Sequence, residues 1–299
     1  MPAGPATPHK WPPTLKRAEG PGGLPFIQVA NAHATACISV YGGQVLSFRP
    51  AGAAHDLLFV STQATHQHGK AIRGGVPVCW PWFGPDPQGL GRPSHGFARN
   101  RLWQWRHAVD LPDGRTQVEL VLRDSAETRA LWPHAFELSL TVTVGTSLGL
   151  TLTTRNTGDA PFEITQALHS YFAVGDIART AVTGLDGCTY IDKATGAGGV
   201  RKRQTGDLVV NTEVDRIYTG APAELCVVDP TLARTIRIRS EGCRTAVVWN
   251  PWATVAAGMA DLADDEYRRF VCVETANAAD DAITLSPGAE HRLAVQLSV

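Results

Sequence analysis

Long hydrophobic runs are absent from this sequence of 299 residues, although 43% of the residues are hydrophobic. No stretch approaches the roughly 18 consecutive apolar residues that a membrane-spanning helix needs. The first 25 residues are rich in proline and glycine and lack the apolar segment of a secretory signal peptide. We therefore expect a cytoplasmic protein without a membrane-spanning segment.

The chain also lacks an excess of charge of either sign. It has 27 Lys and Arg against 28 Asp and Glu, a formal net charge of −1 and an isoelectric point near 6.8. Proteins that bind nucleic acids carry clustered basic residues, and no basic run is present here, so we expect no nucleic-acid partner. A small anionic ligand needs only a few well-placed arginines, and the charge balance does not exclude one.

Paired cysteine motifs are missing as well. The cysteines are scattered without any CxxC pair, which gives no indication of a zinc site or of a disulfide framework. We expect reduced thiols packed in the core. His66 and His68 are spaced like two metal ligands, but no further ligands follow at a suitable spacing, so we predict no metal site. The cysteines are Cys37, Cys79, Cys188, Cys226, Cys243 and Cys272.

Helical periodicity is scarce, and alternation of apolar and polar residues dominates instead. Clear alternation occurs in segments 138–144, 148–152, 236–239 and 293–299. Such alternation is typical of strands with one buried face, and short turns rich in Gly, Ser, Asn and Pro separate these segments. The pattern predicts an all-β fold, a large antiparallel β-sandwich with few short helices.

Two short helical segments are expected within this β pattern. Ser125 is a suitable N-cap for a helix over 125–131, and Pro133 ends it. Residues 264–268 are expected to form a single helical turn.

The domain organisation predicted from the sequence is simple. No internal repeat and no linker divides the chain after residue 25. We expect residues 1–24 to be a flexible lead-in rich in proline and glycine. Residues 25–299 are predicted to form one domain, because a chain of this length can bury a large core.

Three polar clusters interrupt the β pattern, and the first spans residues 70–100. It contains RGGVPVCWPWFG, which begins at Arg73, and SHGFARN, which contains His95 and Arg99. The Gly-Gly pair lets backbone approach a ligand closely, and the two prolines exclude a central strand. The aromatic residues of 80–83 suit an apolar wall against a sugar ring or a core. Two arginines beside such a wall can hold a phosphate, and surface ion pairs are the alternative.

The other two clusters supply candidate acid and base groups. His169, in ALHSYF, follows the strand-like stretch 162–168, and a histidine there can act as a general acid near neutral pH. Glu274 ends the apolar run 270–273, where desolvation raises a carboxyl pKa toward that of a useful base. Asp215, in VDRIY, is a candidate ligand for a sugar hydroxyl. The alternatives are a core histidine, an exposed strand-end glutamate and a turn or ion-pairing aspartate.

Taken together and in this order, the motifs resemble those of a known superfamily. RGGVPVCWPWFG, SHGFARN, ALHSYF, VDRIY, WNPW and CVETAN are similar to motifs of the aldose 1-epimerase superfamily. More narrowly, they resemble its glucose-6-phosphate 1-epimerase (hexose-6-phosphate mutarotase) branch. The resemblance covers residues 25–299. Each motif is short, and the specificity lies in the ordered set.

The resemblance implies a galactose mutarotase-like sandwich that interconverts the anomers of an aldohexose 6-phosphate without a cofactor. It implies that His169 is the general acid and Glu274 the general base. It also implies that four further residues bind the substrate, which we expect to be a small sugar phosphate bound by a monomer. These four are His95 and Asp215 on the sugar, and Arg73 and Arg99 on the phosphate.

Two other functions are compatible with such a sandwich. A carbohydrate-binding or sensor domain needs aromatic and polar groups but no acid–base pair, and the presence of both His169 and Glu274 argues against it. A glycoside hydrolase needs two carboxylates at a fixed separation, which Asp215 and Glu274 are candidates to supply, and a polysaccharide lyase is a related possibility. Fold alone does not decide, because one scaffold hosts many chemistries.

Overall fold

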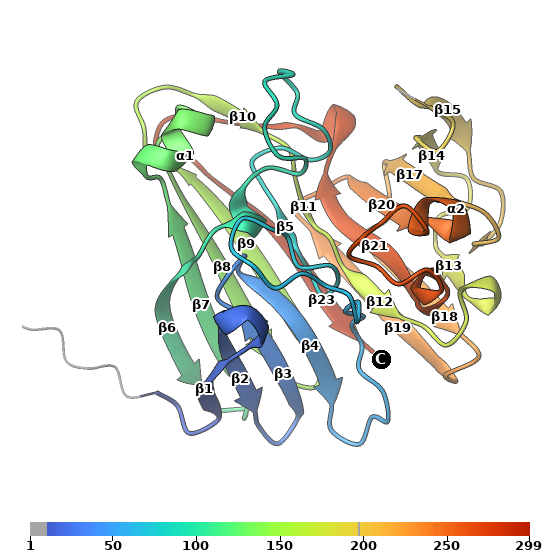
Figure 1. Cartoon of the computed structure of the whole chain (residues 1–299), viewed down its shortest axis with the longest axis horizontal. Coiled ribbons are helices and arrows are strands. Elements are labelled where there is room, and N and C mark those ends of the chain that lie inside the picture. Colours follow the sequence, from blue (N-terminus) through green and yellow to red (C-terminus); the bar gives the residue numbers. More distant parts are fainter. Residues whose placement is uncertain (1–10, 197) are drawn as a thin grey trace, which may run out of the picture.

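The computed structural model describes residues 11–196 and 198–299. Two large sheets, of nine and eight strands, form the body of the molecule, with a four-stranded and a two-stranded sheet beside them (Figure 1). A single hydrophobic cluster contains buried residues of both large sheets, such as Leu140 and Leu152 from one and Val248 and Val273 from the other. The predicted all-β antiparallel sandwich is confirmed.

The nine-stranded sheet has the order β16-β13-β18-β19-β23-β9-β8-β7-β6. In β8 every second residue is buried, so one face packs on the core and the polar residues of the other face water. The alternation seen in the sequence is thus the signature of this sheet. Its strands are β6 (Gln104–Asp110), β7 (Thr116–Arg123), β8 (Phe136–Val144), β9 (Leu148–Asn156), β13 (Ala181–Thr183), β16 (Leu208–Val209), β18 (Glu224–Asp229), β19 (Arg234–Glu241) and β23 (Glu290–Ser298).

The eight-stranded sheet has the order β15-β14-β17-β20-β21-β11-β5, and β12 also pairs with β21. All eight residues of β21 are buried, so neither face of this strand is open to water. A central strand of this kind reads as a continuous run rather than as an alternation. The strands are β5 (Val78–Cys79), β11 (Gln166–Leu168), β12 (Tyr171–Ala173), β14 (Thr189–Asp192), β15 (Val200–Arg203), β17 (Val214–Thr219), β20 (Thr245–Asn250) and β21 (Phe270–Asn277).

The four-stranded sheet changes the expected start of the ordered chain. Its first strand pairs antiparallel with the second, and Leu15 lies opposite Val29. Residues 15–24 therefore belong to the folded unit and not to a flexible lead-in, whereas residues 1–10 of that predicted segment lie outside the described residues. The strands of the two small sheets are β1 (Leu15–Glu19), β2 (Pro25–Ala30), β3 (Ala34–Ser39) and β4 (Gln44–Pro50), then β10 (Phe162–Ile164) and β22 (Ile283–Leu285).

Helices are short, as predicted. In α1 (Ala126–Leu131), Ser125 is the N-cap, and its side chain and that of Thr128 cap each other's backbone N–H groups. The expected turn at 264–268 is a 3-10 helix. The sequence did not indicate α2. The remaining helical segments are α2 (Trp252–Ala256), η1 (Pro21–Gly23), η2 (Ala98–Asn100), η3 (Ile177–Arg179), η4 (Glu266–Arg269) and η5 (Ala279–Asp281).

The segment with the two prolines forms the edge of the eight-stranded sheet, as β5. Trp80, however, is fully buried, contacts the rings of Phe97 and Phe136, and donates a hydrogen bond from Nε1 to Thr154 Oγ1 at 3.0 Å. Trp82 is 4% exposed. Of the alternatives that the sequence left open for these aromatic residues, the core is correct for both tryptophans.

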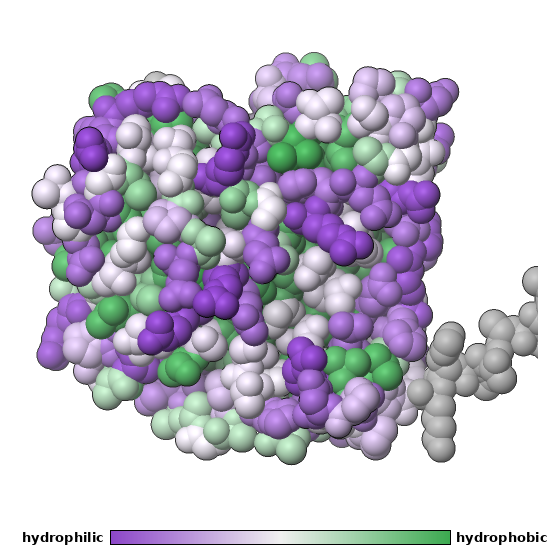
Figure 2. Space-filling view, turned by 180° about the vertical axis from the view of Figure 1, so that it is seen from behind, coloured by the Kyte–Doolittle hydropathy of each residue, from purple (hydrophilic) through white to green (hydrophobic). Residues whose placement is uncertain are grey.

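The surface carries few large apolar side chains. Seen from the side opposite to Figure 1, hydrophilic residues cover much of the molecule, and hydrophobic ones occur in small separate groups (Figure 2). Among the described residues, no helix has the length and hydrophobicity needed to cross a bilayer.

Candidate functional site

Strand register places four side chains on one face of the eight-stranded sheet. Asp215 of β17 lies opposite Trp249 of β20, and Trp249 lies opposite Cys272 of β21. Directly opposed residues point to the same side, and Glu274 points there too because it follows Cys272 by two positions. We call the surface formed by Asp215, Trp249, Cys272 and Glu274 the site face. Glu274 lies inside β21 and is 2% exposed, so the expected strand-end position was wrong.

Small and medium apolar side chains form the rest of the site face. Because Cβ atoms alternate along each strand, the opposite faces of the same strands contribute Val248 and Val273 to the main core. The apolar set beneath the candidate site forms a cluster of its own. It consists of Cys79, Ala167, Ile217, Val247, Ala276 and Ala278, with Phe83 and Ile191 packed against it.

His169 and Glu274 contact each other on this side of the sheet. His169 follows β11, as expected, and its backbone N–H donates to Pro77 O at 3.0 Å. Its Nε2 lies 3.3 Å from Glu274 Oε1, and the histidine is 6% exposed. His169 Nδ1 and Glu274 Oε2 are buried without a partner among the described residues. Two groups that are far apart in sequence thus form one buried pair.

Burial acts on both members of this pair in the same sense. It raises the pKa of Glu274 well above 4.5, an effect strengthened by the charge of Asp215. It lowers the pKa of His169 well below 6.5, and neighbouring positive side chains lower it further. Burial therefore favours the uncharged form of the pair, in which Glu274 carries the one proton and His169 is neutral. A proton transfer across the 3.3 Å contact gives the ionised form.

His95 lies beside this pair and has the backbone conformation of a tight turn, with φ of 61°. Its ring centroid is 5.8 Å from that of His169, and Phe83 packs against it at 4.9 Å. The backbone N–H of Gly84 donates to Nδ1 at 3.3 Å, which leaves the proton on Nε2. Burial and nearby positive charges lower the pKa of His95 to about 3. At neutral pH, His95 is thus an uncharged donor.

The two candidate arginines differ in their surroundings. Arg99 is half-buried and donates from Nη2 to Ser94 O at 2.9 Å, while its Nε is buried without a partner. No carboxylate of the described residues lies within ion-pairing distance of Arg99. Arg73, in contrast, is bound by Asp261, with Nη2 3.0 Å from Oδ2, and by the hydroxyl of Tyr171. Both arginines lower the pKa of His169, which places them around the same pair.

Asp215 is partly exposed, and burial raises its pKa. Asp192 lies opposite Arg216 in the β14–β17 ladder, so Lys193 continues the register opposite Asp215. The backbone N–H of Lys193 donates to Asp215 O at 2.7 Å. The positive charge of the Lys193 side chain lowers the pKa of Asp215 and so opposes the effect of burial. Lys193 was missed in the sequence because it lies in a turn without a motif.

The aromatic neighbours of the pair are Tyr171 and Trp249. The ring of Tyr171 stacks on that of His169, with centroids 4.9 Å apart and planes at 12°. Trp249 presents its ring to His169 at 6.1 Å and 79°. Trp249 thus belongs to the site, whereas the adjacent Asn250 is fully buried and binds Tyr267 O and Phe270 O in the core. The structure thus places the other four predicted residues around the contact between His169 and Glu274. The chemical roles of all six residues stay predictions.

Comparison with known proteins shows the family to which the chain belongs. The sequence profile of the family described as aldose 1-epimerase matches residues 25–298. The chain belongs to the aldose 1-epimerase family. A relative from Cenchrus ciliaris, named "Putative glucose-6-phosphate 1-epimerase", is 39% identical over 96% of this chain and 88% of its own. A relative of the same name from Escherichia coli (strain K12) is also 39% identical, over 86% of this chain and 84% of its own.

Solved structures of other proteins share the fold. A "putative mutarotase (YeaD)" from Salmonella typhimurium superimposes with a TM-score of 0.89 at 35% identity, over 97% of this chain and 94% of its own. The protein HI1317 gives a TM-score of 0.80 at 28% identity, over 97% of both chains. The protein described here is therefore an epimerase with the sandwich of that family.

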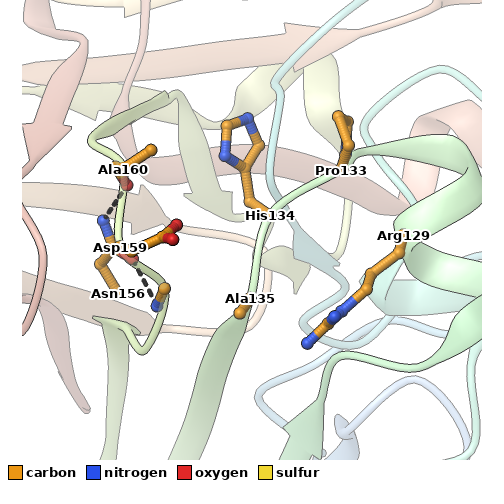
Figure 3. A pocket seen from close by; sticks show the side chains of 8 residues that line it. Arg129, Pro133, His134, Ala135, Asn156, Asp159 and Ala160 are labelled. Atoms are coloured by element: carbon orange, nitrogen blue, oxygen red, sulfur yellow. Dashed lines mark hydrogen bonds between the residues drawn. The ribbon is translucent and has the colours of Figure 1, made fainter.

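The pocket in Figure 3 lies away from the buried pair of this epimerase. It has a volume of about 210 Å³ and is formed where α1 and the turn after β9 meet, and it contains none of the six predicted site residues. Two of its polar side chains are bound within the protein: Arg129 pairs with Asp124, and the Asn156 amide donates to Ala160 O and Leu285 O. Across residues 11–196 and 198–299, no group of three His, Cys, Asp or Glu side chains is placed to hold a metal ion. The six cysteines are free.

Proposed function

We propose that this epimerase interconverts the α and β anomers of an aldohexose 6-phosphate, with glucose 6-phosphate as the preferred substrate. The observation that carries the proposal is the buried contact of 3.3 Å between His169 Nε2 and Glu274 Oε1, with Arg99 nearby and without a carboxylate partner among the described residues. An acid–base pair suits the opening of a sugar ring, and an uncompensated guanidinium suits a phosphate. The names of the two relatives at 39% identity support this substrate class.

The proposed reaction moves two protons and breaks one bond. Glu274, as a carboxylate, takes the proton of the anomeric hydroxyl while His169, as an imidazolium, gives one to the ring oxygen. The bond between C1 and the ring oxygen breaks, and the open aldehyde forms. After rotation about the C1–C2 bond, the two groups act in reverse and close the ring on the other face of the carbonyl. No cofactor is needed, because no net proton or electron is gained or lost.

The proton shared by His169 and Glu274 allows the cycle to run without another proton donor or acceptor. Desolvation favours the uncharged pair at rest, and the ionised pair is one proton transfer away over 3.3 Å. Substrate hydroxyls that hydrogen-bond to the carboxylate stabilise the ionised form, since hydrogen bonds to a charged group favour it. After ring closure, the pair again holds a single proton and is ready for the next substrate.

The remaining side chains are proposed to bind the substrate. The Nε2–H of His95 and the carboxylate of Asp215 bind sugar hydroxyls. The apolar side chains of the site face contact the C–H face of the ring. Arg99, together with Arg73, holds the phosphate. The phosphate then supplies binding energy far from the reacting bond, and this energy positions the ring over the pair. Cytoplasmic location and a monomeric state stay predictions.

Anomer exchange measured by NMR on glucose 6-phosphate, free glucose and free galactose tests the proposal. We expect fast exchange of glucose 6-phosphate and a much lower kcat/KM for both free sugars. Equal rates with the free sugars would contradict the phosphate assignment. Binding without exchange would indicate a carbohydrate-binding domain, and release of reducing ends from an oligosaccharide would indicate a glycoside hydrolase.

A further inference from the structure

Arg73 is held on two sides by groups of the protein itself. Its Nε and Nη2 donate to the two carboxylate oxygens of Asp261 at 3.0–3.2 Å, and its Nη1 donates to the hydroxyl of Tyr171 at 3.0 Å. The side chains of Arg73 and Asp261 are only 25% and 26% exposed. Most donors of this guanidinium are thus occupied before any substrate arrives, unlike those of Arg99.

Tyr171 links this ion pair to the reacting histidine. Its ring stacks on His169 at 4.9 Å, while Trp249 and Phe270 pack against it at 6.0 and 5.3 Å. Tyr171 is 2% exposed, so the ring has no room to rotate away. The hydroxyl end is fixed by Arg73 and the ring face lies on the imidazole. The orientation of the Tyr171 ring therefore determines the orientation of the His169 imidazole.

Asp261 is itself anchored to the body of the protein. The next residue, Leu262, is 2% exposed in the main core. Glu266, four residues further, accepts hydrogen bonds from Ser61 Oγ at 2.6 Å and from the backbone N–H of Thr62 at 2.8 Å. The loop between α2 and η4 thus presents the Asp261 carboxylate in a fixed place.

We propose that Asp261, Arg73 and Tyr171 form a brace that holds the imidazole of His169 in the orientation needed for proton transfer. Tyr171 and Asp261 are then positioning residues of the epimerase, and Arg73 has a second role besides phosphate binding. The inference rests on the proposed acid–base role of His169, but it does not depend on whether the sugar carries a phosphate. Positioning matters because a displacement of about 1 Å at a reacting group can cost about 100-fold in rate.

The brace also sets the charge near His169. The groups that face this imidazole are Glu274 in direct contact, Tyr171 on its ring face, and His95, Arg99 and Arg73 through their charges. The positive charge of Arg73 disfavours the imidazolium, and the Asp261 carboxylate, 3.0 Å from Arg73, offsets part of that charge. Removing one or the other should therefore shift the protonation of His169 in opposite directions.

The first test compares two tyrosine variants. Tyr171→Phe keeps the stacked ring and removes only the oxygen that Arg73 binds. We expect kcat to fall about 10-fold, by the same factor for glucose 6-phosphate and for free glucose, with the ratio of their KM values unchanged. The matched control is Tyr218→Phe, because Tyr218 is fully buried in the same sheet and its hydroxyl binds Gln204 Oε1 at 2.8 Å. The control should retain the wild-type kcat.

The second test is the pH dependence of kcat/KM in Asp261→Asn and Arg73→Gln. We expect the acid limb to move to lower pH in Asp261→Asn and to higher pH in Arg73→Gln, which a general loss of stability would not produce. Shifts of the same sign, or a Tyr171→Phe variant no different from Tyr218→Phe, would overturn the brace. A wild-type protein that exchanges the anomers of free glucose but not those of glucose 6-phosphate would instead overturn the phosphate assignment and leave the brace testable.

Discussion

The reacting centre and the phosphate end of the proposed site differ in how their charges are compensated. At the reacting centre, His169 and Glu274 are 6% and 2% exposed, and each is the other's partner. At the phosphate end, Arg99 is half-buried, and no carboxylate of residues 11–196 and 198–299 pairs with it. A buried pair that shares one proton can do chemistry without outside charge, whereas an uncompensated guanidinium needs an anion from the ligand. Substitutions at the reacting centre should alter kcat, and substitutions at the phosphate end should alter KM.

The largest effect is expected at the reacting centre. His169→Gln removes the group that protonates the ring oxygen, and we expect kcat to fall roughly 100- to 10,000-fold for phosphorylated and free sugars alike. A suitable control is His291→Gln, since His291 is a half-buried histidine with Nε2 3.1 Å from Asn277 Oδ1. Anomer exchange by NMR measures both. A loss restricted to the phosphorylated sugar would remove the distinction between the two ends.

The phosphate end should respond in KM. Arg99→Ala removes a charged hydrogen bond worth about 1.5–3 kcal/mol, which corresponds to a rise in KM for glucose 6-phosphate of roughly 10- to 100-fold. The KM for free glucose should change little in this variant. Arg155→Ala, at an exposed arginine 3.9 Å from Glu290, is the control for a general change in charge. An equal rise of KM for both sugars would contradict the assignment of Arg99.

The pH profile tests the shared proton. Activity should be bell-shaped, because one group must be protonated and the other deprotonated. Burial lowers the pKa of His169 below 6.5, so the acid limb should lie below pH 6.5. Burial raises the pKa of Glu274 well above 4.5, so activity should persist at neutral pH before the basic limb. An acid limb at or above pH 6.5 in kcat/KM would indicate an imidazole that is not desolvated.

The smallest expected effect is on stability. The unfolded chain releases the Glu274 proton near pH 4.5, while the folded protein retains it to higher pH because burial raises that pKa. The folded state then binds more protons, so this group makes the wild type less stable as pH rises above 4.5. Glu274→Gln should therefore raise Tm more at pH 8 than at pH 5, as measured by calorimetry. A gain that is larger at pH 5 would contradict the raised pKa.

The comparison also indicates what the sequence could predict. Alternation of period two predicted β8, β9, β19 and β23, which are neighbours in the nine-stranded sheet, since buried and less buried residues alternate along them. It did not predict that β21 continues through Glu274 to Asn277, because both faces of that strand are buried and its polar residues find partners inside. Asn277, for example, donates to Gly242 O at 2.9 Å.

Short elements and loop contacts were beyond sequence reasoning for a different reason. Leu15–Glu19 lies within a segment rich in proline and glycine, and its pairing with β2 supplies the order that its composition does not indicate. The five residues of α2 are too few for a helical period. Asp261 follows in a stretch with several other acidic residues, and only the path of the loop selects it as the partner of Arg73.

The role of Glu274 as the base is tested by the anomer exchange rate of glucose 6-phosphate in Glu274→Gln. Glutamine preserves the shape of the side chain and cannot accept the proton of the anomeric hydroxyl. We expect a kcat below about 1% of the wild type, in a variant whose circular dichroism and Tm show an intact fold. A folded variant that retains more than about a tenth of the wild-type kcat would contradict the role of Glu274 as the base.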